Sequence, residues 1–313
     1  MRHPLLGAAI LITLLLGTLL VSCSSPGPYG PTTTPGTRAA YSPVVDVQAA
    51  SDADWVRLFN GVDLAGWTPK VRGFESGEDP QGTFSVQNGA ITVSYGNYGG
   101  VFREQFGHLF HDTPYGWYHL EVEYRFTGEQ IADGPGWAWR NSGVMVHGQP
   151  VSTIGLDQDF PASIEVQLLG GNGTEPRTTA NLCTPGTNVV YQGALDTRHC
   201  IESSSETYPG DGWVRVGITV LGDSLVVHSV EGREVLRYEK PQLGGGNVDG
   251  HDPALVRDGE MLTAGTISLQ SESHPVQFRR VDLLPLEGCM DPASPAFRPY
   301  FVRSNASACG VTP

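Results

Sequence analysis

The segment Trp117–Phe126 alternates strictly: Leu120, Val122, Tyr124 and Phe126 are separated by His119, Glu121, Glu123 and Arg125. A period of two residues indicates a β-strand with one buried face, whereas a helix would repeat every 3.6 residues. Elsewhere in residues 51–288, helical periodicity is almost absent. The chain is therefore expected to fold through sheets.

Turn signals separate further short strands. Asn88-Gly89 lies between Phe84–Gln87 and Ile91–Val93, and this dipeptide favours the tight turn of a hairpin because it tolerates positive φ. More strands are predicted at Val214–Val220, Ser224–Val230, Glu234–Tyr238, Thr266–Gln270 and Val276–Leu284. With 40 Gly and 23 Pro, turns are frequent, so an all-β sandwich or jelly roll is expected. Two polar, Gly-rich stretches, 169–211 and 241–262, are predicted to be long functional loops.

The first 22 residues predict an export signal. Arg2 and His3 precede the apolar run Leu5–Val21, and small residues lead to Cys23. The ending Leu-Val-Ser-Cys resembles the bacterial lipobox, in which the cysteine after the cut is lipidated; a plain anchor helix is the alternative. Residues 23–50 are rich in Pro, Gly, Ser and Thr and predict a flexible tether. We therefore expect an exported protein, lipid-anchored to the bacterial cell envelope in the periplasm or at the outer surface.

The cysteines support export. If Cys23 carries lipid, four remain, and an even number in an oxidising compartment favours two disulfides. Of the three possible pairings, we expect Cys183–Cys200 with Cys289–Cys309, which close short loops. No C-x-x-C spacing is present, so a zinc site is not expected. One domain is predicted over residues 51–288, followed by a tail, 289–313, that the second disulfide closes.

The formal charge of −14 narrows the choice of partner. Nucleic acid is excluded as an expected partner, because binding it requires Lys and Arg to neutralise phosphates. An acidic surface also disfavours an anionic polymer. A neutral ligand is the better expectation.

Four motifs carry a family resemblance. They are LFNGVDLAGW at 58–67, RNSGV at 140–144, IEVQL at 164–168, and Leu269-Gln270 followed by HPVQFR at 274–279. Taken in order over roughly residues 53–287, they resemble the 3-keto-disaccharide hydrolase family. The resemblance implies a two-sheet jelly-roll sandwich of the concanavalin A-like lectin and glucanase type. For at least some members it also implies hydrolysis of glycosides oxidised to a ketone at carbon 3.

Three of these strands share a pattern of apolar and polar faces. The polar faces carry Glu165 and Gln167 on one strand, Ser268 and Gln270 on another, and Asn141, Met145 and His147 on the third. We expect the three strands to form one floor whose planar groups bond sugar hydroxyls. A solvated sheet face without a ligand is the alternative.

Glu165 is the leading catalytic candidate. The proton at carbon 2 of a 3-keto sugar is acidic, so a base there drives elimination at carbon 1, and water then adds to the enone. Glu165 or His147 could be the base, and Arg140, Asn141 or Gln270 could hold the enolate oxygen. The alternative is that Glu165 binds a ligand without proton transfer.

Other residues complete the expected site. Gln167, His274 and Trp139 are predicted to bind substrate, and Trp137 and Trp139 suit stacking on a sugar ring. No cofactor is expected, although Asp157 and Asp159 could contribute to a Ca²⁺ site. The strand at Glu165 lacks the second and third acids of the Glu-x-Asp-x-x-Glu pattern of laminarinase-like relatives, so retaining glycosidase chemistry is disfavoured.

Three functions follow as hypotheses. The first is a hydrolase or lyase that acts on 3-keto glycosides. The second is a carbohydrate-binding lipoprotein without turnover, and the third is a structural protein of the cell envelope.

Overall fold

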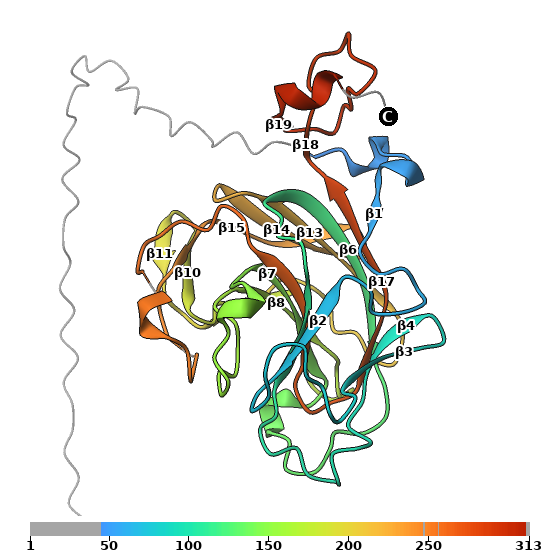
Figure 1. Ribbon diagram of the computed structural model, residues 1–313, viewed down its shortest axis with the longest axis vertical. Coiled ribbons are helices and arrows are strands. Elements are labelled where there is room, and N and C mark those ends of the chain that lie inside the picture. The colour runs from blue at the N-terminus through green and yellow to red at the C-terminus, as the bar shows by residue number, and fades with distance from the viewer. Residues whose placement is uncertain (1–44, 247, 256, 311–313) are drawn as a thin grey trace, which may run out of the picture. The chain divides into compact units, whose positions relative to one another are not determined.

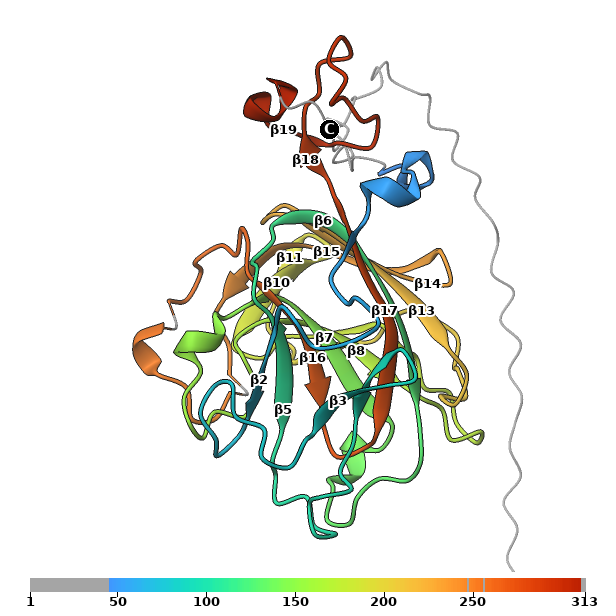
Figure 2. The same ribbon diagram turned by 45° about the vertical axis from the view of Figure 1, so that its right-hand side comes forward.

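Strands provide the regular structure of this chain, as the alternating pattern predicts. The computed structural model describes residues 45–246, 248–255 and 257–310, and these residues contain no α-helix. The predicted signal sequence and Cys23 lie outside the described residues. Two antiparallel sheets stack face to face (Figures 1 and 2). The expected two-sheet jelly-roll sandwich of the concanavalin A-like type is confirmed.

The larger sheet has the strand order β11-β10-β15-β14-β13-β6-β17-β4-β3, with β1 paired to β17. Its strands, in chain order, are β1 (Val56–Arg57), β3 (Phe84–Gln87), β4 (Ala90–Val93), β6 (Trp117–Phe126), β10 (Thr187–Tyr191), β11 (Ala194–Asp196), β13 (Val214–Leu221), β14 (Leu225–Val230), β15 (Arg233–Leu243) and β17 (Val276–Pro285). The predicted hairpin at Asn88-Gly89 joins β3 to β4, and both turn residues have positive φ.

The smaller sheet carries the candidate site. Its order is β12-β9-β8-β7-β16-β5-β2, so strands far apart in the sequence lie side by side. In chain order its strands are β2 (Trp67–Val71), β5 (Gly107–His111), β7 (Asn141–Gly148), β8 (Ile164–Leu169), β9 (Asn181–Cys183), β12 (Cys200–Ile201) and β16 (Thr266–Ser271). Short 3-10 turns occur at η1 (Val47–Ala49), η2 (Asp52–Asp54), η3 (Gly136–Ala138), η4 (Val151–Thr153), η5 (Pro253–Leu255) and η6 (Ala306–Gly310).

The core lies between the two sheets. β6 contributes its predicted face, with Leu120, Val122 and Tyr124 fully buried. From the smaller sheet, Val144 and Val166 belong to the same cluster. Burial of these apolar faces drives the stacking of the sheets. One face of each strand is thereby fixed toward the core, which leaves the alternate residues of the smaller sheet for other uses.

The expectation of a long loop over 169–211 is wrong. Four short strands, β9 to β12, lie inside this stretch. β9 pairs with β8 and β12, whereas β10 pairs with β11 and with the distant β15. They are too short to show a period, so a local pattern could not reveal them. The predicted Cys183–Cys200 disulfide is confirmed and links β9 to β12. The stretch 241–262 does remain mostly irregular, with η5 as its one described helical turn.

The C-terminal segment packs against the beginning of the described chain (Figures 1 and 2). It contains β18 (Glu287–Gly288), β19 (Arg303–Ser304) and η6, and the predicted Cys289–Cys309 disulfide is confirmed. Arg298 forms an ion pair with Asp54 at 2.8 Å. Val45, Val47 and Ala50, at the end of the predicted tether, pack on an apolar cluster with Tyr300.

Two disulfides are typical of proteins outside the cytosol, so this is an extracellular or periplasmic protein. Within the described part of the chain, we find no helix with the length and apolar character that crossing a membrane requires.

Candidate functional site

Glu165 lies on the face of the smaller sheet that points away from the sandwich core, called the outer face below. Its neighbours Ile164 and Val166 are in the core, so strand alternation turns Glu165 the other way. Glu165 pairs across the sheet with Met145 of β7, which pairs in turn with Ser268 of β16. The three strands of the predicted floor are therefore adjacent.

Gly143 lets two of the predicted site residues meet. A Cβ at this position would lie 2.8 Å from Glu165 Oε1 and 3.0 Å from Gln270 Oε1. These separations are at or below the shortest that real Cβ atoms show, so a glycine is needed here for both side chains to keep their positions. The structure thus brings Glu165 and Gln270 together over Gly143.

A second carboxyl, Glu272, accompanies Glu165. Glu165 is 5% exposed, and burial raises its pKa to about 8. Glu272 is 3% exposed, and its pKa is raised well above the usual value by burial and then by the charge of Glu165. Glu272 therefore keeps its proton when Glu165 has lost its own. Sequence reasoning missed Glu272, although the alternation of Ser268 and Gln270 extends to it.

His108 and Lys70 extend the polar surface along the sheet. His108 of β5 is paired with Gln270 on one side and with Lys70 of β2 on the other. Burial, and then the charge of Lys70, lowers the pKa of His108 to about 3, so its ring is neutral. Lys70 Nζ donates to the carbonyl oxygens of Val71 and, at 3.0 Å, Leu156. Neither residue was predicted from the sequence. The apolar residue Leu109, next to His108, was the sign that His108 could face away from the core.

Several buried polar atoms near this pair have no hydrogen-bond partner among the described residues. They are Gln270 Oε1 and Nε2, Glu272 Oε2, His108 Nε2, Ser268 Oγ and Asn141 Oδ1. Buried polar groups in folded proteins are nearly always bonded, so a concentration of exceptions in one place is unusual. These atoms can bond a polar ligand that enters this part of the outer face.

Asn141 and Gln167 make bonds of their own. Asn141, at the start of β7, is buried, and its Nδ2 donates to the carbonyl oxygen of Trp137 at 3.5 Å. Gln167 is half-buried, and its Oε1 accepts a hydrogen bond from Asn181 Nδ2 at 3.1 Å. Both side chains come from the alternate positions of β7 and β8 that do not contribute to the core.

Trp139, Arg140, His274 and Arg177 form what we call the Trp139 cluster. The guanidinium carbon of Arg140 is 4.7 Å from the centre of the Trp139 ring, and the His274 ring lies edge-on at 5.9 Å. Arg177 lies 5.6 Å from the same ring, although no motif indicated it. The structure thus brings three predicted substrate-binding residues together.

Trp137 is 55% exposed and stacks on Phe106 with the ring centres 5.9 Å apart. An exposed aromatic ring held by a second ring is suited to contact with the apolar face of a sugar.

His147 is not on the outer face, and its predicted place beside Glu165 is wrong. Its Nε2 bonds the carbonyl oxygen of Gly222, in the turn between β13 and β14 of the larger sheet, at 3.0 Å. The pairing of β7 with β16 shifts register here, and His147 has a φ of 51°, so the alternation breaks at this residue. Burial lowers its pKa to about 4.

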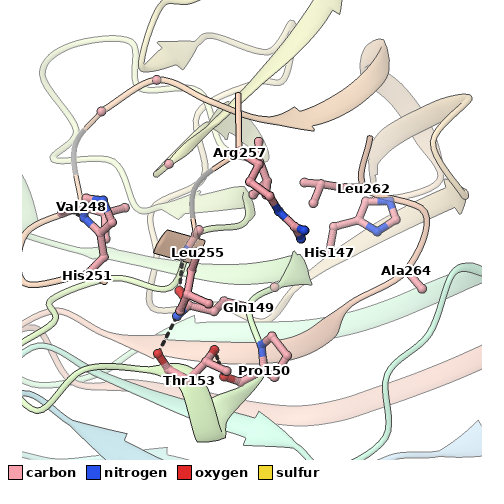
Figure 3. Close-up of a pocket in the computed structure, with 16 residues that line it drawn as sticks. His147, Gln149, Pro150, Thr153, Val248, His251, Leu255, Arg257, Leu262 and Ala264 are labelled. Atoms are coloured by element: carbon pink, nitrogen blue, oxygen red, sulfur yellow. Dashed lines mark hydrogen bonds between the residues drawn. The ribbon is translucent and has the colours of Figure 1, made fainter. Parts of the chain in front are cut away.

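Figure 3 shows where His147 lies instead: on the wall of a cavity of about 280 Å³, beside Leu262 and Ala264. The cavity is lined by the end of β7 and the residues that follow it, by Leu243 at the end of β15, and by residues from the 244–264 stretch that include Val248, Leu255 and Leu262. Glu165, Gln270 and Glu272 are not among its lining residues.

The metal-ligand candidates are engaged in other bonds. In the described residues, Cys183, His199 and Cys200 are close enough to share an ion, but the two cysteines are joined in a disulfide and offer no thiolate. At the predicted Ca²⁺ position, Asp159 Oδ1 accepts the backbone N–H groups of Phe160 and Asp249. Asp159 thus joins its own loop to the 244–264 stretch.

The sequence of this chain matches one family of proteins. The sequence profile of the 3-keto-alpha-glucoside-1,2-lyase-like domain matches residues 54–284. The chain belongs to this family. Every residue named above for the outer face and for the Trp139 cluster falls within the matched range. Among curated proteins, none matches the sequence of this chain.

Several solved structures are similar to this 3-keto-alpha-glucoside-1,2-lyase-like chain. A candidate glycosyl hydrolase from Parabacteroides distasonis ATCC 8503 has 15% identity and a TM-score of 0.45, covering 74% of this chain and 99% of its own. The β-glucanase of Bacillus licheniformis has 11% identity and a TM-score of 0.40, covering 73% and 96%. The carbohydrate-binding module CBM66 of Bacillus subtilis has 9% identity and a TM-score of 0.37, covering 69% and 94%.

Proposed function

We propose that this protein cleaves glycosides whose sugar carries a ketone at carbon 3. The observation that carries the proposal is the buried Glu165–Glu272 pair beside Gln270. Glu165 ionises first, with a pKa of about 8, whereas Glu272 holds its proton more strongly. One base and one acid in a single site are what an elimination next to a ketone requires.

The proposed reaction has two steps. In the first, ionised Glu165 removes the proton at carbon 2, the carbon 3 oxygen takes the negative charge, and the bond from carbon 1 to the leaving oxygen breaks. Protonated Glu272 gives its proton to that oxygen, and an enone remains. In the second, the oxygen of water adds to carbon 1 as ionised Glu272 takes a proton from that water, and protonated Glu165, after exchanging its proton with solvent, protonates carbon 2. The sum is hydrolysis of the glycoside, and both carboxyls return to their starting state.

Gln270 has the geometry to assist the first step. Its amide nitrogen has no partner among the described residues and its side chain meets Glu165 over Gly143. A donor placed at the ketone oxygen stabilises the charge that develops there, typically by about 3–4 kcal/mol in the transition state. His108, neutral and unpartnered at Nε2, lies opposite Gln270 and is a second contact for the sugar.

The test is turnover of a 3-keto disaccharide in D₂O. The enzyme should release a reducing sugar that carries deuterium at carbon 2, and the same disaccharide without the ketone should stay intact. Glu165→Gln should reduce release by roughly 10²–10⁴-fold while sugar binding persists. Glu202→Gln, which changes an exposed glutamate, is the matched control.

If the released sugar carries no more deuterium at carbon 2 than spontaneous exchange introduces, the elimination route is refuted. Binding of sugars without release from any 3-keto disaccharide would replace the proposal with a carbohydrate-binding function.

We also propose that the mature protein is lipid-anchored at Cys23, on the strength of the sequence Leu-Val-Ser-Cys. Labelling of growing bacteria with a fatty-acid analogue should mark the wild-type protein and not Cys23→Ala. An unlabelled, soluble wild-type protein would contradict the anchor.

A further inference from the structure

The Trp139 cluster concentrates positive charge without a carboxylate. Arg140 and Arg177 are both within 6 Å of the Trp139 ring, and neither forms an ion pair with a described acidic residue. Nine other arginine–carboxylate contacts occur in the described residues, so arginines elsewhere in this acidic chain do find partners. Two guanidinium groups held together without a counter-charge repel one another.

Hydrogen bonds within the protein position these two arginines, but they do not use all of the N–H donors. Arg140 Nη1 donates to the carbonyl oxygens of Gly171 and Pro209, and Arg177 Nη1 donates to those of Gly170 and Arg140. Arg140 Nε is buried and has no partner among the described residues. Carbonyl oxygens carry only partial charge, so they orient the two cations without neutralising them.

The fold makes room for this arrangement with glycines. A Cβ on Gly170 would lie 3.1 Å from Arg140 Cδ, and one on Gly210 would lie 3.3 Å from the same atom. The Arg140 side chain therefore passes beside two positions where the absence of a side chain gives it space. The Arg140 side chain is therefore fitted into this end of the sheet.

His274 adds an independent sign of a ligand. It is 1% exposed, and both of its ring nitrogens lack a partner among the described residues. Burial, followed by the charges of Arg140 and Arg177, lowers its pKa to about 4, so the ring is neutral and offers one donor and one acceptor. A buried imidazole with both nitrogens unpartnered, beside two uncompensated arginines, marks a polar binding site.

We propose that the Trp139 cluster binds an acidic group of the sugar, so that the preferred substrate is an acidic glycoside. The inference rests on the proposed function and names its substrate class. Carboxylate, sulfate and phosphate oxygens all match the fork of an arginine, and paired arginines are typical of such sites. His274 follows Glu272 by two residues, which places the acidic group close to the reacting sugar.

This proposal reverses the expectation of a neutral ligand. The formal charge of −14 describes the whole chain, whereas a ligand responds to the charges around its own site. At the Trp139 cluster those charges are two guanidinium groups.

The test is binding, and it does not depend on turnover. Glucuronate, glucose 6-sulfate, glucose 6-phosphate and glucose are titrated against the whole protein by calorimetry at low and at physiological salt. At least one acidic sugar should bind roughly tenfold or more tightly than glucose, and the advantage should shrink with salt. The ranking of the three acids identifies the acidic group.

Two arginine variants localise the effect. Arg177→Gln should reduce the preference for the acidic sugar about tenfold, and Arg177→Lys should restore part of it because the charge returns. Arg198→Gln, which removes an exposed arginine paired with Asp196, should leave the preference unchanged. Thermal melts identify any variant that fails to fold, and in that case the wild-type preference and its salt dependence decide.

Equal binding of glucose and of all three acidic sugars would overturn the inference. The experiment measures binding, so it can detect a preference for acidic sugars even if no 3-keto disaccharide is cleaved. Conversely, cleavage of neutral keto sugars without any acidic preference would remove this inference and leave the proposed function intact.

Discussion

The Glu165 carboxyl and the Gln270 amide meet over Gly143, each with an oxygen 2.8–3.0 Å from the point that a Cβ would occupy. The positions of the proposed base, Glu165, and of the proposed oxyanion donor, Gln270, therefore depend on the absence of a side chain at Gly143, in the strand between them.

Gly143→Ala should separate this pair. The added methyl group would contact Glu165 Oε1 and Cγ and Gln270 Oε1, so at least one side chain must move. We expect a loss of roughly 1–3 kcal/mol in the free energy of unfolding, because the site is overpacked, and a fall in kcat/KM of at least about tenfold. Gly212→Ala, with no atom within 4 Å of the new Cβ, is the control. Unchanged kcat/KM in Gly143→Ala would show that this approach is unimportant for turnover.

Activity should rise with pH up to about pH 8. Because burial raises the pKa of Glu165 to about 8, only a minority of the protein carries the ionised base at neutral pH. The value of kcat/KM should therefore increase about tenfold per pH unit on the acid side and level off above the pKa.

Glu272→Gln separates the two carboxyls in the same pH measurement. Glu272 remains protonated when Glu165 ionises, so its replacement should lower the plateau and keep the rise. A wild-type profile that is flat between pH 6 and 8 would contradict Glu165 as the base.

Much of this site could be predicted from alternation alone. Glu165 and Gln270 follow directly from strands in which every second residue is apolar, because one sheet face must enter the core. The same alternation continues to Glu272, two residues after Gln270, so the position of Glu272 also follows from the pattern.

His147 could not be placed in this way. A register shift and a positive φ turn its ring toward the larger sheet. Nothing in the local sequence indicates the shift or the positive φ. Arg177 was missed for a different reason: its neighbours 172–176 are exposed and irregular, and only the long-range contact with Trp139 gives it a role.

Acid should destabilise the fold through its buried histidines. Burial lowers the pKa of His119 and of His228 from 6.5 to about 4, so the unfolded chain binds protons that the folded chain refuses. Their contribution to stability is complete above about pH 6.5 and is lost as the pH falls toward 4. In urea unfolding, each should contribute a slope of about 1.4 kcal/mol per pH unit in this range. His228→Gln should reduce the slope of the free energy of unfolding against pH by the contribution of one histidine. A variant with the wild-type slope would contradict a buried, neutral His228.

Glu165 should act in the opposite direction. Its pKa is about 8 when folded and 4.5 as a free group, so its contribution to stability is complete below about pH 4.5 and is lost as the pH rises through 8. Glu165→Gln should therefore flatten the decline of the free energy of unfolding between pH 6.5 and 8, where the two histidines no longer contribute a slope. A decline that is equally steep in wild type and variant would indicate that Glu165 is ionised throughout.

The two disulfides should differ in their effect on activity although they close loops of similar length. Cys183 pairs directly with Glu165 across β8 and β9, and its bond to Cys200 holds the edge of that sheet. Cys289–Cys309 closes the C-terminal segment, beyond the family match at 54–284. With sequence separations of 17 and 20, each double Cys→Ser variant should lose about 3 kcal/mol of stability. Below the melting temperature, we expect the first to lower kcat/KM several-fold, because β8 loses a fixed neighbour, and the second to leave it within about twofold. Equal activities in the two double variants would show that β9 does not help to position Glu165.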